Sequence, residues 1–109
     1  MEDAEILSVL TDQDFYDDLY FSEMINMDKF EKIVAVLNFL SLEWSSVEYV
    51  RKDIVGAIFK LYSFIRNKKE EYQESDKILY KKLENICIQI DEIINENLFP
   101  DDLLELIDN

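Results

Sequence analysis

The residues with the widest range of chemistry lie between positions 12 and 23, where carboxylates alternate with aromatic rings. The stretch reads Asp-Gln-Asp-Phe-Tyr-Asp-Asp-Leu-Tyr-Phe-Ser-Glu and holds five acids and four aromatic residues. Carboxylates pair with Arg and Lys and speed encounter with a basic partner, while tyrosine supplies large, rigid contact area. We therefore predict a partner-binding surface formed by Asp12, Asp14, Tyr16, Asp17, Asp18, Tyr20 and Glu23. Phe15 and Leu19 are expected to face the core and Tyr20 to be exposed, while Tyr16 is expected either to face the core with them or to be exposed beside Tyr20.

The chain lacks several residues that common catalytic and metal-binding sites require. The chain has no His, which excludes Ser-His-Asp and Cys-His arrangements and the Glu-x-x-His pairs of di-iron bundles. Cys87 lies between Ile86 and Ile88, which is typical of a small core residue rather than a nucleophile. The carboxylates that begin at Asp12 resemble a calcium loop in part, but the glycine of such a loop is absent. We expect no enzymatic activity, no cofactor and no specific metal site.

Charge is distributed unevenly along the chain. Residues 1–28 hold nine acids and no Lys or Arg, and residues 83–109 hold eight unopposed acids. Residues 29–82 carry all eleven Lys and Arg against eight acids, so the net charge of −14 divides as −9, +3 and −8. Charge concentrated at the two ends favours binding to a basic protein. The same charge repels phosphates and anionic lipids, which disfavours direct nucleic-acid or membrane binding.

The composition predicts an all-α fold with a single domain over residues 1–109. The chain has one Gly and one Pro, and tight β-turns usually need these residues, so several hairpins are not expected. Its content of 49% hydrophobic residues is too high for a disordered acidic chain. Apolar residues spaced by three and four predict a single compact bundle of about four main helices. Their expected ranges are 12–25, 28–40, about 45–68 and about 75–97. Short helical turns are expected near residues 6–10 and after Asp101.

The helix at 45–68 is predicted to be the central one. Its apolar stripe consists of Val47, Val50, Ile54, Ile58, Leu61 and Ile65. Gly56 interrupts this helix at a cost of about 1 kcal/mol relative to Ala, which predicts the close approach of a neighbouring helix. Trp44 lies in the break before it and is expected to be a core residue.

The segment from Trp44 to Tyr72 resembles the small, acidic, all-helical immunity proteins that bacteria pair with toxins of contact-dependent or polymorphic systems. The similar pattern is Trp44, then Val-Glu-Tyr-Val-Arg-Lys-Asp-Ile-Val-Gly-Ala-Ile-Phe-Lys-Leu-Tyr at 47–62, then Tyr72. The resemblance implies stoichiometric inhibition of a cognate toxin domain, often a basic nuclease. It assigns no contact residue, because members of the family bind different toxins through different residues.

A homodimeric adaptor and a nucleic-acid mimic remain alternative functions. The isoleucine stripe of residues 75–97 is compatible with the seam of a homodimeric adaptor, although we expect a monomer. A phage-encoded inhibitor that mimics nucleic acid has the same charge requirements. The acidic start, the single Cys and the lack of an apolar run near ~20 residues predict a cytoplasmic protein.

Overall fold

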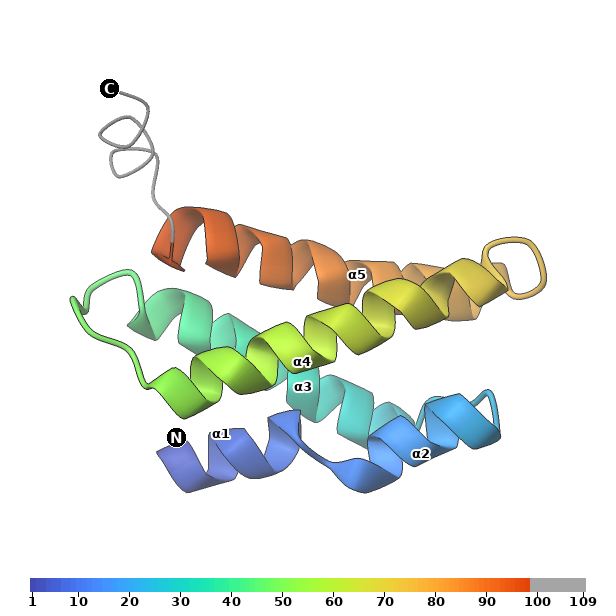
Figure 1. Cartoon of the computed structure of the whole chain (residues 1–109), viewed down its shortest axis with the longest axis horizontal. Coiled ribbons are helices and arrows are strands. Elements are labelled where there is room, and N and C mark those ends of the chain that lie inside the picture. Colours follow the sequence, from blue (N-terminus) through green and yellow to red (C-terminus); the bar gives the residue numbers. More distant parts are fainter. Residues whose placement is uncertain (99–109) are drawn as a thin grey trace.

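The computed structural model describes residues 1–98, and every regular element in that range is helical (Figure 1). The α-helices are α1 (Asp3–Leu10), α2 (Gln13–Phe21), α3 (Met27–Glu43), α4 (Lys52–Lys69) and α5 (Lys77–Ile93). A 3₁₀ turn, Glu70–Tyr72, follows α4, and a π-helical turn, Ile94–Leu98, follows α5. The all-α prediction is confirmed. The short helix predicted after Asp101 lies outside the described residues.

The helices form a bundle in which two short helices share one position. Each of α3 and α4 packs against both α1 and α5. Figure 1 shows α1 and α2 following one another along the same side of the bundle. The two short helices therefore occupy together the place that one long helix would take in a four-helix bundle.

The break between α1 and α2 keeps the apolar residues on the inner side. Ile6 and Leu10 of α1 are fully buried, and so are Phe15 and Leu19 of α2. If α1 continued past Leu10, the next inward position would fall on polar residues 13 or 14. The Asp12 side chain instead accepts a hydrogen bond from the Phe15 backbone N–H at 3.2 Å and starts a new helix. The expected turn at residues 6–10 is thus a helix with its own buried face.

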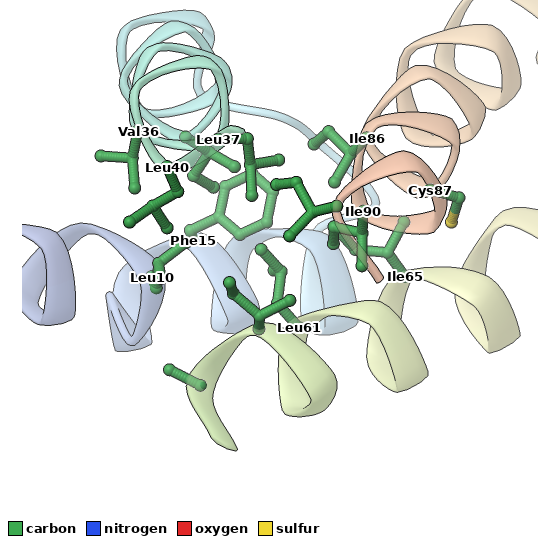
Figure 2. Close-up of a cluster of buried hydrophobic side chains, with 14 of the residues drawn as sticks. Leu10, Phe15, Val36, Leu37, Leu40, Leu61, Ile65, Ile86, Cys87 and Ile90 are labelled. Carbon is green, nitrogen blue, oxygen red and sulfur yellow. The ribbon is translucent and has the colours of Figure 1, made fainter. Parts of the chain in front are cut away.

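Phe15 lies at the centre of the core. Figure 2 shows its ring among Leu10 of α1, Leu37 of α3, Leu61 of α4 and Ile90 of α5. Phe15 therefore places a side chain of α2 in the core cluster to which the other four helices also contribute.

The apolar stripe of α5 is buried inside the chain. Leu83, Ile86, Ile90 and Ile93 are all fully buried, so the proposed homodimer seam is already occupied by intramolecular packing. Cys87 is buried on the side of α5 away from Phe15, and burial raises the pKa of its thiol (Figure 2). The predicted core role of Cys87 is confirmed.

Helix α4 begins later than predicted. It starts at Lys52 rather than near Ser46, and Val47 and Val50 are 43% and 36% exposed instead of buried. Arg51 has an extended backbone and pairs with Asp3 of α1 at 2.9 Å and with Asp53 at 2.6 Å. These contacts lie at the N-terminal boundary of α4, directly before its first residue.

Gly56 inside α4 and Trp44 before it are both expected from the sequence to pack closely against neighbouring elements. Gly56 is exposed, and a Cβ added there would meet nothing within 4 Å beyond its own stretch of helix, so the predicted close approach of a helix is wrong. Gly56 lies between the inward positions Ile54 and Ile58 and therefore points outward. Trp44 is buried at the C-terminal end of α3, as predicted.

Candidate protein-binding surface

The burial of two residues determines which side of α2 faces outward. Phe15 and Leu19 are four residues apart and fully buried, so they fix the rotation of the helix. The next two residues, Tyr20 and Phe21, are then 60% and 76% exposed. Their rings contact each other edge to face, with centroids 4.9 Å apart. Two adjacent exposed aromatic rings are typical of an interaction surface.

The first two acids of the predicted surface are paired within the chain. Both carboxylate oxygens of Asp12 lie 2.9 Å from Nζ of Lys29 in α3, and Asp14 lies 3.6 Å from the same nitrogen. The hydrogen bond from Lys29 holds the pKa of the Asp12 carboxyl below its usual range. Asp14 is nevertheless 82% exposed. Asp12 therefore attaches α2 to α3, whereas Asp14 remains accessible to a partner.

Tyr16 is half-buried, which is between the core and the exposed positions that the sequence left open for it. Its ring lies 4.8 Å from the ring of Phe64 in α4, measured between centroids, and its hydroxyl donates to the backbone oxygen of Leu10 at 3.3 Å. Burial raises the pKa of Tyr16 to about 12. The side chain follows Phe15 on the side of α2 that faces α4, which explains why it is half-buried.

A groove of about 310 Å³ separates α2 from α4. Its lining residues are Thr11, Gln13, Tyr16, Asp17, Tyr20, Phe21, Lys60 and Phe64. The structure thus brings together Tyr16, Asp17 and Tyr20 of the predicted set. It adds Lys60 and Phe64, which are four residues apart and share one face of α4. That spacing is visible in the sequence, but nothing in it places this face beside α2.

The exposed position of Tyr20 is supported by a lysine from the end of α4. Nζ of Lys68 lies 5.1 Å from the centre of the Tyr20 ring and 2.9 Å from a carboxylate oxygen of Glu71. The Lys68 side chain is only 11% exposed, and its pairing with Glu71 raises its pKa. A cation held over an aromatic face restricts the ring, so Tyr20 is oriented before any partner binds.

The last predicted contact, Glu23, lies in the turn that ends α2. Its φ of 54° is in the left-handed region, where a residue with a side chain is strained relative to glycine. The carbonyl of Asp18 accepts hydrogen bonds from the N–H groups of Ser22 and Met24, at 3.0 and 3.3 Å. Asp18 itself is half-buried and Glu23 is exposed. Neither acid lines the groove between α2 and α4, and Glu23 instead lines a second groove next to the turn.

Apolar surface continues beyond this turn. Met24, Met27 and Ile78 are exposed and line this second groove, between the turn and the start of α5. The sequence reading did not single out these residues, because isolated apolar residues outside a helical stripe are common on protein surfaces.

The described residues contain neither a metal-binding cluster nor a membrane-spanning helix. In residues 1–98, no group of three or more His, Cys, Asp or Glu side chains is arranged to hold a metal ion. None of the described helices is both long and apolar enough to cross a membrane. Comparisons of the chain with protein-family models, with curated proteins and with solved structures found no match.

Proposed function

We propose that this chain is an inhibitor that binds a basic protein, and that it acts as an immunity protein against a cognate toxin domain such as a nuclease. The observation that carries the proposal is the exposed pair Tyr20 and Phe21 on a helix that also bears the exposed Asp14 and the half-buried Asp17 and Asp18. Interfaces depend on a few aromatic anchors surrounded by polar residues, and this part of α2 offers both. The partner would be blocked by occlusion of its active site or of a neighbouring surface.

The carboxylates and the aromatic residues would contribute to different steps of binding. Asp17 and Asp18 form no ion pair within residues 1–98, so their charge is available to attract a basic partner. Such charges act mainly on the association rate, whereas a buried aromatic anchor slows dissociation. An inhibitor of a toxin that acts inside the producing cell has to bind it inside that cell, which agrees with the expected cytoplasmic location.

The two alternatives are less well supported by the geometry. A homodimer seam on α5 would have to use its exposed isoleucines, Ile78 and Ile88, because the regular stripe is in the core. A nucleic-acid mimic would rely on carboxylates alone. The oriented aromatic pair on α2 favours an anchored protein interface over both.

Co-expression tests the proposal directly. Where a neighbouring gene encodes a protein that ends in a basic domain, that domain is expressed with and without the chain, and bacterial growth is measured. We expect growth only when the chain is present. Failure of the intact chain to restore growth, although it folds and is expressed, would contradict the immunity function.

Surface kinetics against the same domain then tests the assigned residues. Changing Asp14, Asp17 and Asp18 to Asn should slow association about tenfold or more at low salt. Changing Glu43, Glu48 and Glu92 to Gln removes the same charge from exposed positions outside α2 and should have a smaller effect.

A second pair of variants separates the aromatic anchor from general surface area. Tyr20→Ala should raise the dissociation rate by about thirtyfold, equivalent to about 2 kcal/mol. Tyr49→Ala, at another exposed tyrosine, should leave it unchanged. Unchanged kinetics in both the α2 triple variant and Tyr20→Ala would remove α2 from the interface.

A further inference from the structure

We infer that the groove between α2 and α4 binds a single arginine side chain of the partner. The inference rests on the proposed function only in taking the partner to be basic. It assigns an occupant to a groove whose lining residues come from α2 and α4 and from the break before α2.

The size and the lining of the groove suit a flat cation. Its volume of about 310 Å³ is at the lower end of the range for ligand pockets, which fits one long side chain rather than a large molecule. Four aromatic rings line it, those of Tyr16, Tyr20, Phe21 and Phe64. Guanidinium is planar and weakly hydrated and stacks on aromatic faces, so these rings favour arginine over the more strongly hydrated lysine.

Asp17 supplies a carboxylate at the same place. One of its oxygens, Oδ1, accepts a hydrogen bond from Nε2 of Gln13 at 2.9 Å, which holds the side chain in position. Asp17 has no ion pair within the described part of the chain, so its second oxygen and remaining lone pairs are available. A guanidinium group pairs with such a carboxylate through parallel hydrogen bonds. The neighbouring Asp14 and Asp18 add to the negative potential of α2.

Lys68 lies 5.1 Å from the centre of the Tyr20 ring, but Lys60 is the one cation among the residues that line the groove. Because removing Lys60 should change the affinity for cations and for anions in opposite directions, Lys60 makes the inference testable. It is exposed and has no ion pair within residues 1–98. Its long side chain can extend into solvent, but its charge still opposes a second cation. Loss of Lys60 should therefore strengthen the binding of arginine and weaken the binding of an anion.

A titration of the intact chain with small probes tests the inference without any partner protein. Backbone amide NMR spectra are followed as N-acetyl-arginine amide is added, with the lysine, leucine and glutamate analogues as competing probes. We expect shifts confined to residues 11–21 and 60–64, with dissociation constants on the order of 1–10 mM because one side chain makes few contacts. The arginine probe should bind about threefold or more tightly than the lysine probe.

Variants with matched controls complete the experiment. Asp17→Asn should weaken arginine binding about fivefold or more, whereas Glu92→Gln, at an exposed acid on α5, should not change it. Tyr20→Leu keeps apolar area but removes the ring and should weaken binding about threefold. Lys60→Met should strengthen it about twofold or more. Each spectrum also shows whether the variant is folded.

Several results would overturn the inference. They are shifts outside the groove, no shifts at all with the arginine probe, preference for the glutamate probe, or weaker arginine binding in Lys60→Met. The proposed function would fail separately. Arginine binding without growth rescue would support the arginine site and contradict immunity. Growth rescue without arginine binding would support immunity and contradict the arginine site.

Discussion

At the scale of single residues, acids on one short helix have different roles. Asp12 accepts a hydrogen bond from the Phe15 N–H and pairs through both oxygens with Lys29, so it stabilises α2. Asp17 is held by Gln13 and has no cation beside it within residues 1–98. In the sequence both acids belong to one cluster. The difference between their roles depends on Lys29, which is 17 residues from Asp12 and is not part of that cluster. Residue type alone therefore could not separate the structural acid, Asp12, from Asp17, the acid that we propose for binding.

The role of Asp12 leads to a stability prediction. Asp12→Ala removes the cap and the ion pair and should cost about 1–2 kcal/mol, whereas Asp12→Asn keeps a capping oxygen and should cost less. Urea denaturation at neutral pH measures both changes. Asp14→Ala is the control, because that side chain is 82% exposed, and it should stay within about 0.5 kcal/mol of the unchanged protein. Equal costs at positions 12 and 14 would contradict the structural role of Asp12.

The pH dependence of the same variant has a defined sign. Lys29 lowers the pKa of Asp12 below its ordinary value of 3.8. The carboxylate therefore adds stability above the unfolded-state pKa, and this contribution is lost as the pH falls through the folded-state pKa. The stability difference between the unchanged protein and Asp12→Asn should be constant above about pH 5 and should shrink as the pH falls towards about 2. A difference that grows on acidification would show that Asp12 is not held as a carboxylate.

At the scale of the helices, the interiors were predictable and the ends were not. Ile54, Ile58 and Leu61 follow the three-and-four spacing and are all buried. Val47 and Val50 continue that spacing but lie in an irregular segment before the helix and are exposed. At the end of this segment Arg51 pairs with Asp3, 48 residues away, a contact that no local pattern reveals. The groove is unpredictable for the same reason, since it needs α2 and α4 to lie side by side.

Gly56 provides a prediction at this scale. Gly56→Ala should stabilise the protein by about 0.5–1 kcal/mol, because Gly is a poor residue inside a helix and the added methyl group meets nothing within 4 Å beyond its own stretch of helix. Thermal and urea denaturation measure the change. Ala57→Gly, at the buried neighbouring position, should destabilise and serves as the control. A destabilising Gly56→Ala would mean that another surface approaches α4 there, as the sequence first suggested.

At the scale of the whole molecule, net charge acts in two opposite ways. Fourteen excess negative charges repel one another and destabilise a compact chain, while the same charges attract a basic partner. The ion pairs within residues 1–98 involve just three cations, Lys29, Arg51 and Lys68. Most of their side chains are at least partly exposed, so these pairs contribute little to stability. Repulsion should therefore outweigh pairing in the free protein.

Salt should consequently affect the free protein and its complex in opposite directions. Raising NaCl from about 10 to about 150 mM shortens the screening length from about 30 to about 8 Å and should raise the melting temperature by several degrees. The same change should slow association with a basic partner, because it screens the attraction. The triple variant of Glu43, Glu48 and Glu92 to Gln carries three fewer negative charges and should respond less to salt in the melting experiment. A melting temperature that falls with salt would show that the exposed ion pairs outweigh the repulsion, and salt-independent association would show that the charge of α2 does not guide the partner.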